Sequence, residues 1–330
     1  MQITNPHIKV FFQSTFNTPF IQDDIDTLQN NFRLKQQTGS GFIHLIKIIF
    51  SIFHTDIFFS WFASVYAGVG VFVARFIGVK SIIALGGVDV SKEPEYNYGV
   101  WLSPWKAKFV RYAIRNAECV LVLDPVLRDD AIRLAEYDGK NIVYLRAGFD
   151  SAYWKPVGMK ENIVLTVAVT KEKNVFIRKG LDILIEAARM LPAIKFVVVG
   201  TDPKFAEGFN PPANIKFLPR VPRRELLPFY QRAKVYAQPS RREGLPHTLC
   251  EAMLCGCIPV GSNADGIPTA IGNDGVLVPV KNSFALAEAL KQCMETEEDI
   301  GSRARARITA MFQKEKRDRE IVRLVKGLVQ

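Results

Sequence analysis

The feature that most constrains the fold is a regular alternation of short apolar runs with helix-length amphipathic segments. In the first half of the chain, the runs with the length of buried strands are residues 8–13, 31–34, 56–61, 80–85, 119–123 and 141–145. The helical segments between them are residues 19–29, 42–53, 66–77, 105–116 and 125–137. This alternation predicts a mostly parallel β-sheet with helices on both faces.

The same pattern restarts in the second half. Strands are expected at residues 162–169, 194–200, 214–218, 234–238, 258–261 and 276–278, and helices at 179–191, 223–232, 246–255 and 283–295. Residues 147–158 between the halves contain two glycines and a proline, which is typical of a linker. A chain of 330 residues also suits two domains. We therefore predict two doubly wound α/β domains, residues 1–155 and 156–330, that face each other across a cleft. The last helix could pack back on the first domain.

One stretch without charges, residues 57–74, is just long enough to be considered as a membrane span. Ser60, Ser64, Gly68 and Gly70 interrupt it, and its first half is rich in β-branched and aromatic residues. These features favour a buried strand, a turn and a buried helix over a span. Residues 1–10 do not have the charged-then-apolar pattern of a signal peptide.

The net charge of +10 is concentrated in the second half. Up to Lys155 there are 16 basic and 14 acidic residues, a balance of +2; from Pro156 onward there are 27 and 19, a balance of +8. This charge is compatible with a basic solvated surface, a polyanionic partner, an anionic membrane or a phosphate-bearing ligand. Nucleic acid is the least favoured partner, because the basic residues are dispersed and no recognition motif accompanies them.

Five cysteines are present: Cys119, Cys250, Cys255, Cys257 and Cys293. Three of them cluster in sequence and could suggest a metal site, but no second cysteine pair or histidine pair completes one. An odd number of cysteines in a long chain favours buried thiols in a reducing cytoplasm over a disulfide framework.

The most informative segment is residues 239–256, PSRREGLPHTLCEAMLCG. Pro246 is expected to open a helix, where free amides and the helix dipole attract anions. Gly244 allows close approach of the backbone to a ligand. Glu243 in the loop and Glu251 in the helix could accept hydrogen bonds from the vicinal hydroxyls of a sugar or ribose. Taken singly, each carboxylate could instead be a loop charge or a capping or surface group.

The spacing Glu243-x7-Glu251 resembles that of retaining glycosyltransferases of family 4, which have two facing Rossmann-like domains (GT-B architecture). Residues 148–150, 178–188, 196–200, 217–221 and 275–279 also resemble family motifs. The chain departs from the family at Ala168-Val169, where a Gly-Arg pair is usual, and it lacks the N-terminal glycine-rich loop.

The resemblance implies that Glu251 binds the ribose hydroxyls and that Glu243 contacts the donor sugar. Lys179, with Arg178 beside it, would neutralise the diphosphate, although these residues with Lys171 and Lys173 could also form a solvated loop. The remaining residues implied on the donor side are Gly244, Leu245, Pro246, His247, Ser240, Gly200, Arg220 and Val221. His247 could equally be a surface residue at the start of the helix.

The first half offers fewer candidates. Gly86, Gly87 and Asp89 follow a predicted strand and could meet an acceptor hydroxyl, as could Asn17 after the first strand. The alternative for Gly86, Gly87 and Asp89 is a simple turn followed by a helix cap. The very apolar helix at residues 42–53 is either core or a membrane contact. Residues 303–326 are expected to form a solvated final helix or, as a second possibility, a membrane contact.

The predicted activity is transfer of a sugar from a UDP- or GDP-linked donor to a hydroxyl acceptor, a cell-surface or lipid-linked glycan, with retention and without a metal ion. The expected location is the cytoplasm or the cytoplasmic membrane face. Two alternatives remain open: a nucleotide-sugar epimerase or hydrolase of similar shape, and a non-catalytic nucleotide-sugar-binding protein.

Overall fold

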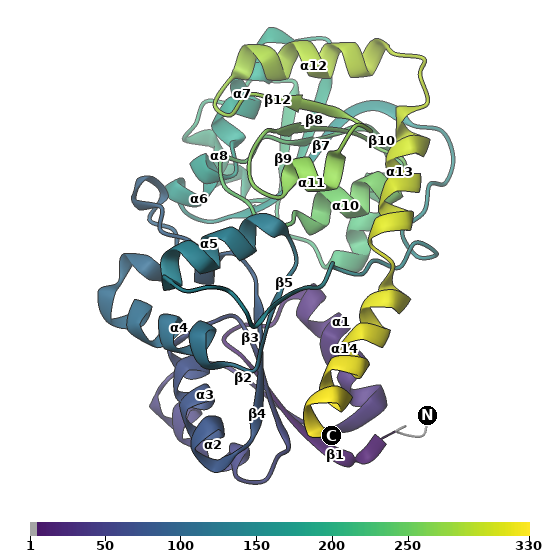
Figure 1. Cartoon of the computed structure of the whole chain (residues 1–330). Coiled ribbons are helices and arrows are strands. Elements are labelled where there is room, and N and C mark those ends of the chain that lie inside the picture. Colours follow the sequence, from purple (N-terminus) through teal and green to yellow (C-terminus); the bar gives the residue numbers. More distant parts are fainter. Residues whose placement is uncertain (1–4) are drawn as a thin grey trace. The chain divides into compact units, whose positions relative to one another are not determined.

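The structure is a computed structural model that describes residues 5–330 (Figure 1). The first four residues of the segment inspected for a signal peptide lie outside this range. The chain forms two compact units. Unit 1 comprises Met1–Gly148 together with Lys314–Gln330, and unit 2 comprises Phe149–Gln313.

Unit 1 is built on a six-stranded sheet in the order β2-β1-β3-β4-β5-β6, and every neighbouring pair is parallel. Its strands are β1 (Asn5–Ser14), β2 (Phe32–Thr38), β3 (Ile57–Trp61), β4 (Lys80–Leu85), β5 (Cys119–Val122) and β6 (Ile142–Tyr144). Its helices are α1 (Pro19–Asn31), α2 (Phe42–Ile52), α3 (Val65–Ile77), α4 (Pro104–Asn116), α5 (Pro125–Ala135) and α14 (Lys314–Val329). Short 3₁₀ turns lie at η1 (Val88–Val90), η2 (Pro94–Tyr96) and η3 (Val100–Leu102).

The uncharged segment at residues 57–74 is a strand, a turn and a helix, as predicted. All five residues of β3 are buried, as expected for a central parallel strand that is covered on both faces. In α3, a Cβ added at Gly68 would lie 2.7 Å from the carbonyl of Phe109, and one at Gly70 would lie 2.3 Å from the ring of Phe58. The two glycines therefore let α3 pack closely on its neighbours. Within residues 5–330, no helix has both the length and the apolar character needed to cross a membrane.

Unit 2 has the same architecture, a parallel sheet in the order β12-β11-β10-β7-β8-β9. Its strands are β7 (Glu161–Thr170), β8 (Lys195–Thr201), β9 (Ile215–Leu218), β10 (Ala233–Gln238), β11 (Ile258–Ser262) and β12 (Val276–Val278). Its helices are α6 (Lys173–Arg178), α7 (Leu181–Met190), α8 (Pro203–Glu207), α9 (Leu227–Arg232), α10 (His247–Leu254), α11 (Ile267–Ile271), α12 (Ser283–Glu295) and α13 (Ile300–Met311), and η4 (Arg223–Leu226) precedes α9. The predicted pair of Rossmann-like α/β domains is thus confirmed.

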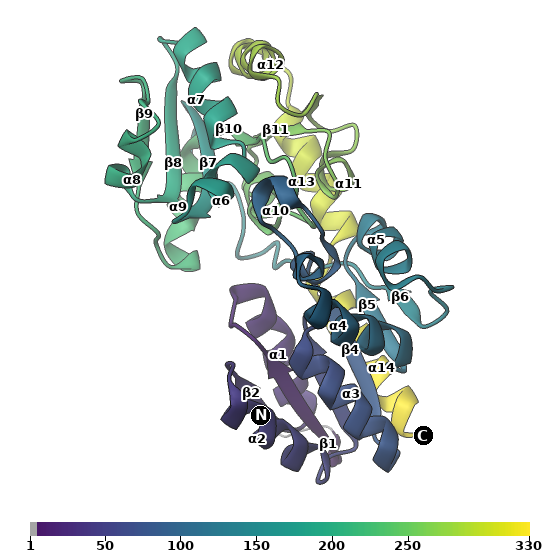
Figure 2. The same cartoon turned by 90° about the vertical axis from the view of Figure 1, so that its left-hand side faces the viewer.

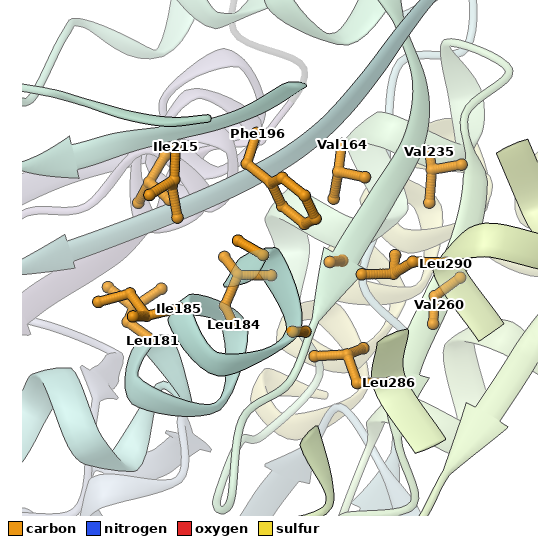
Figure 3. Packing of buried hydrophobic residues seen from close by; sticks show 14 of the residues in the cluster. Val164, Leu181, Leu184, Ile185, Phe196, Ile215, Val235, Val260, Leu286 and Leu290 are labelled. Atoms are coloured by element: carbon orange, nitrogen blue, oxygen red, sulfur yellow. The ribbon is translucent and has the colours of Figure 1, made fainter. Parts of the chain in front are cut away.

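The core of unit 2 lies between this sheet and the helices α7 and α12 (Figure 3). Leu184 and Ile185 of α7 and Leu286 and Leu290 of α12 are all at most 1% exposed. They pack against apolar side chains of the central strands, which include Val164, Phe196, Val235 and Val260. Burial of one such side chain stabilises the folded state by roughly 1.5–3 kcal/mol, so this cluster keeps the carboxyl ends of the strands in a fixed arrangement.

Two helix predictions in unit 2 need correction. The helix expected at residues 179–191 is α7, which begins at Leu181 because Gly180 before it has a φ of +71°. The short helix α6, which ends just before Lys179, was not expected. A Cβ at residue 180 would lie 1.9 Å from the carbonyl oxygen of Pro239, so only glycine fits this contact. The short helices α8 and α11, of five residues each, were not expected.

The final helix expected at residues 303–326 is also two helices, and they belong to different units. The break falls at Phe312 and Gln313, where the amide of Phe149 donates to the carbonyl of Phe312 at 2.9 Å. Beyond it, α14 packs on α1 through a buried ion pair in which the Arg317 guanidinium binds Asp24 at 2.7–2.8 Å. The compact units therefore divide at residues 148/149 and 313/314, whereas the sequence indicated one boundary at 155/156.

Helix α2 combines features of both interpretations given for residues 42–53. His44, Ile48 and Ile52 are buried against unit 1. The opposite side is exposed, with Phe42 at 76% and Phe50 at 67%. Helix α3 packs between α2 and α4, so the three lie side by side (Figure 2).

Candidate functional site

The loop from β10 to α10, at the carboxyl end of a central strand of unit 2, carries five predicted donor-side residues: Ser240, Glu243, Gly244, Leu245 and Pro246. Ser240 in this loop is fully buried. Its hydroxyl accepts a hydrogen bond from Gln238 Nε2 at 2.8 Å, and its carbonyl accepts one from the Ser262 hydroxyl. These bonds join the ends of β10 and β11, which gives the loop a defined starting point.

The loop after β11 braces the same segment. Asp265 accepts a hydrogen bond from the amide of Glu243 at 2.7 Å and forms an ion pair with Arg242. A Cβ at Gly266 would lie 2.5 Å from the carbonyl oxygen of Gly244, so the two loops are in direct backbone contact. The position of Glu243 is therefore determined by neighbouring structure, which is typical of a preorganised site.

Glu243 forms an ion pair with Lys179. Both residues are among those predicted for the donor site. The distance from Lys179 Nζ to Glu243 Oε2 is 2.5 Å, and the side chains are 20% and 16% exposed. The Ser240 hydroxyl lies 3.4 Å from the same carboxylate oxygen. Burial acts to raise the pKa of Glu243, but the positive charges of Lys179 and Arg178 outweigh it and hold the pKa below its usual value. The carboxylate is therefore ionised at neutral pH.

Arg178 and Lys179 do not lie in a solvated loop, because they end α6 and contact the β10–α10 loop. Arg178 is 9% exposed, and its Nη1 donates to the carbonyl of Arg242 at 3.1 Å. The amide of Arg241 donates to the carbonyl of Arg178 at 2.8 Å, and the guanidinium of Arg241 binds both carboxylate oxygens of Asp182. The solvated alternative applies to Lys171 and Lys173, which are exposed.

Glu251 lies on α10 and is 2% exposed. Arg223 Nε donates to its Oε1 at 2.6 Å, and the hydroxyl of Tyr230 donates to its Oε2 at 3.1 Å. The interpretation of Glu251 as a surface carboxylate is therefore wrong. A carboxylate buried beside the carboxyl end of β10 and held by two donors is an acceptor of fixed orientation.

The other residues predicted for the donor side fall into two groups. Leu245 and Pro246 are buried and Gly244 is half-buried, with Pro246 directly preceding α10. His247 is not a simple surface residue, since its ring packs on that of Phe149 with centroids 5.1 Å apart. The second group belongs to the neighbouring strands: Gly200 lies within β8, and Arg220 and Val221 follow β9.

Two of these residues have clear local constraints. Gly200 has a φ of +111°, and a Cβ there would lie 2.7 Å from the carbonyl oxygen of Ala168, so it permits the close approach of β8 to β7. Arg220 is exposed. Val169, at the position where the family usually has arginine, is 46% exposed near the end of β7.

The corresponding end of the unit 1 sheet is organised around Asp89, which is fully buried. Its carboxylate accepts hydrogen bonds from the amides of Ala63, Gly86 and Gly87 at 2.9, 3.1 and 2.8 Å. Burial raises the pKa of Asp89 to about 6, although these hydrogen bonds act to lower it. This arrangement favours the alternative in which Asp89 is a local cap over a direct contact with an acceptor.

The neighbouring candidates behave in the same way. A Cβ at Gly86 would lie 2.1 Å from the ring of Phe62, and Gly87 has a φ of +118°. Both positions therefore require glycine for the turn itself. Asn17 is exposed and donates to Gln22 Oε1 at 3.4 Å.

Comparison with known proteins identifies the second unit. Residues 156–310 match the family model described as "Glycosyl transferases group 1". This match assigns a group 1 glycosyltransferase domain to residues 156–310. The resemblance predicted from the Glu243 and Glu251 region is confirmed at the level of the family; the roles of the two residues stay predictions.

The chain is similar to two named glycosyltransferases over part of their length. It is 25% identical over 228 residues to D-inositol 3-phosphate glycosyltransferase of Mycolicibacterium smegmatis, covering 63% of this chain and 52% of that enzyme. It is 29% identical over 166 residues to N,N'-diacetylbacillosaminyl-diphospho-undecaprenol alpha-1,3-N-acetylgalactosaminyltransferase of Campylobacter jejuni, covering 47% and 42%. The chain thus spans about half the length of these relatives.

The fold of the chain matches solved structures over nearly its whole length. Alignment with Anabaena Alr3699/HepE, solved in complex with UDP-glucose, gives a TM-score of 0.79 at 17% identity, covering 97% of this chain and 100% of the other. At this identity the match establishes the shared fold.

Sequence analysis missed three side chains that surround the predicted carboxylates: Arg223, Tyr230 and Asp265. Each is joined to its partner across 21 to 28 residues of sequence. One signal was available, because a carboxylate predicted inside an apolar helix such as Glu251 requires a cationic or hydrogen-bonding partner.

The structure also describes the surroundings of the cysteines. All five are buried, and within residues 5–330 no group of three or more metal-binding side chains comes together.

Proposed function

We propose that the protein transfers a sugar, with retention of anomeric configuration, from a UDP- or GDP-linked donor to a hydroxyl group. The observation that carries the proposal is the pair of carboxylates, Glu243 and Glu251, held beside the cations Lys179 and Arg223 at the carboxyl end of the unit 2 sheet. In doubly wound α/β folds, ligands bind at this end. Similarity to two proteins named as glycosyltransferases supports the reaction class.

Each side chain has a role that fits its surroundings. Glu251 would bind the ribose hydroxyls, and Glu243 would contact the donor sugar. As the bond to the diphosphate breaks, negative charge develops on the leaving group and the sugar becomes oxocarbenium-like. Lys179, Arg178 and the amides at the start of α10 would stabilise that negative charge.

The phosphate then accepts the proton of the attacking hydroxyl, and a side-chain nucleophile is not needed. Because the cations of the chain neutralise the diphosphate in this scheme, we expect activity to be unchanged by EDTA. Loss of activity in EDTA, with recovery on addition of Mg²⁺ or Mn²⁺, would contradict it.

The activity is tested by a thermal-shift screen of nucleoside diphosphate sugars, followed by measurement of nucleoside diphosphate release. Release that depends on an added acceptor supports a transferase. Release without acceptor indicates a hydrolase, conversion of the sugar without release indicates an epimerase, and binding without turnover indicates a binding protein. A protein that binds none of the donors does not have the proposed function.

We also propose that unit 1 docks on the anionic cytoplasmic face of a membrane, where a lipid-linked acceptor would lie. Helices α2, α3 and α4 contain six lysines and arginines and not one aspartate or glutamate. They are Lys47, Arg75, Lys106, Lys108, Arg111 and Arg115. Basic residues near an anionic leaflet contribute about 1 kcal/mol each.

The same helices expose large apolar side chains, which is unusual for a surface in water. Their exposed fractions are 76% for Phe42, 71% for Ile43, 67% for Phe50, 58% for Phe72, 84% for Phe76 and 56% for Trp105. Exposed aromatic groups on the same helices as lysine and arginine match the chemistry of an anionic membrane interface, although Arg111 is already paired with Glu136 at 3.0 Å.

Vesicle flotation tests this docking surface. We expect the protein to float with vesicles of phosphatidylglycerol and phosphatidylcholine at low salt, and less at high salt or with phosphatidylcholine alone. The double variant Phe50→Glu, Phe76→Glu should lose flotation. Phe284→Glu, which changes a 63% exposed aromatic residue on α12 of unit 2, is the control and should float normally. No flotation under any condition would rule the surface out.

A further inference from the structure

The surroundings of Glu251 assign a role to a residue outside the predicted motif. Glu251 is 2% exposed, and an isolated charge at such a position is strongly disfavoured. Arg223 Nε at 2.6 Å supplies the compensating charge, and the Tyr230 hydroxyl at 3.1 Å supplies a second donor. The contact with Arg223 therefore stabilises the charged form of this carboxylate.

Arg223 is itself held in place by the segment that begins unit 2. Its guanidinium lies 5.4 Å from the centre of the Trp154 ring, a distance typical of a cation–π contact. Trp154 is 3% exposed and packs edge-on against Tyr230, with ring centroids 5.6 Å apart. Its carbonyl accepts a hydrogen bond from Arg305 Nη1 at 2.7 Å. Trp154 thus contacts both Arg223 and Tyr230, the two donors to Glu251, and Arg305 holds its backbone in place.

We propose that Arg223 is a positioning residue of the donor site, which keeps Glu251 charged and oriented for the ribose hydroxyls, and that Trp154 holds Arg223 for this purpose. The proposal rests on the ribose-binding role proposed for Glu251. A carboxylate can accept about four hydrogen bonds, so the bonds from Arg223 and Tyr230 leave capacity for a diol. Arg223 begins η4, two residues after Val221, and links the turn after β9 to α10.

The test compares the affinities of ribose and 2′-deoxyribose nucleotides by calorimetry. The probes are UDP and GDP, whichever the wild type binds more tightly, and the 2′-deoxy form of the same nucleotide. The variant is Arg223→Gln, and the matched control is Arg224→Gln, which changes the exposed neighbouring arginine. Measurements at pH 5.5 and pH 8 follow the charge on Glu251.

We expect Arg223→Gln to bind the ribonucleotide about tenfold more weakly, since a hydrogen bond to a charged group contributes roughly 1.5–3 kcal/mol. The 2′-deoxy nucleotide should lose less, so the preference for ribose should shrink. The loss should be larger at pH 5.5 than at pH 8, because a carboxylate without its cationic partner is protonated more readily. Arg224→Gln should behave as the wild type.

Three other results have distinct meanings. Unchanged affinity and ribose preference in Arg223→Gln overturn the proposal, as does an equal loss for both nucleotides at both pH values, which would indicate a merely structural ion pair. If Arg223→Gln does not fold, Arg223→Lys replaces it, because lysine retains the charge. Arg223→Lys should lose less ribonucleotide affinity and keep the wild-type pH dependence. An equal loss of affinity for the ribose and 2′-deoxyribose nucleotides in Arg223→Lys would also overturn the proposal. A wild type that binds neither UDP nor GDP refutes the proposed function instead.

Discussion

The carboxyl ends of the two sheets differ in how they use charge, although the sheets share one architecture. In unit 2, this end carries ion pairs that involve Glu243, Glu251, Asp265 and Asp182, each with a lysine or arginine partner. In unit 1, the Asp89 carboxylate accepts hydrogen bonds from backbone amides. The one buried ion pair described there, Asp24 with Arg317, joins α1 to α14. A fold thus provides the position of a site, and the side chains at the strand ends decide its chemistry.

This difference has a physical consequence. Paired side-chain charges can exchange partners with a charged ligand, because each remains solvated or paired in either state. A carboxylate that ties together backbone amides cannot leave them without disrupting the turn. We therefore expect mutations at the unit 2 end to change ligand binding and catalysis, and mutation of Asp89 to change stability.

The largest effect is expected from Lys179→Gln. Removing a cation that stabilises charge on the leaving diphosphate should lower kcat by about 100-fold, within the range observed for single groups that act on the transition state. Steady-state release of nucleoside diphosphate measures the change. Lys173→Gln, which alters an exposed lysine on α6, should retain activity. A normal kcat in Lys179→Gln would place this lysine outside the reaction.

A smaller effect is expected from Glu251→Ala, which should weaken donor binding by about tenfold or more through the loss of charge-assisted hydrogen bonds. Calorimetric titration with the donor found by screening provides the measurement. Glu225→Ala removes an exposed carboxylate from η4 and is the control. Unchanged donor affinity in a correctly folded Glu251→Ala protein would show that Glu251 does not bind the ribose.

The elements were predictable because their signals are local. The bounds expected for β4, β12 and α12 agree with the structure, since a continuous apolar run or an amphipathic stripe is followed directly by a turn. Gly180 also gave a local signal, because glycine commonly ends a helix in the left-handed conformation. Attention to that signal would have moved the expected start of α7 from Lys179 to Leu181.

The pairing of side chains was not predictable in the same way. Lys179 and Glu243 are 64 residues apart, and Arg317 and Asp24 are 293 apart. Such pairs depend on how whole elements pack, and a list of charged residues does not contain that information. The packing of the last helix on the first domain was given as a possibility, and α14 is in fact part of unit 1 through its contact with α1. The boundary between the units lies at residues 148/149, seven residues before the expected 155/156.

The smallest effect that we predict tests the role of Asp89. Because its pKa is about 6 in the folded protein and near 3.8 otherwise, the folded state binds a proton more readily than the unfolded state between these values. Protonation therefore stabilises the fold as the pH is lowered, and this contribution is lost as the pH rises through 6. From pH 7 to pH 5 the gain should be about 1 kcal/mol for this group.

Asp89→Asn should lower stability at every pH and should lack this gain on acidification. Urea unfolding followed by tryptophan fluorescence measures it, because Trp101 Nε1 donates to the carbonyl of Asp89 at 2.7 Å and reports on this turn. Asp129→Asn, at an exposed position of α5 in the same unit, should retain the wild-type pH dependence. If Asp89→Asn also retains the wild-type gain in stability on acidification, that gain does not come from protonation of Asp89. A loss of donor binding in Asp89→Asn without a loss of stability would contradict the proposed difference, in which Asp89 acts on stability and the unit 2 residues act on ligand binding and catalysis.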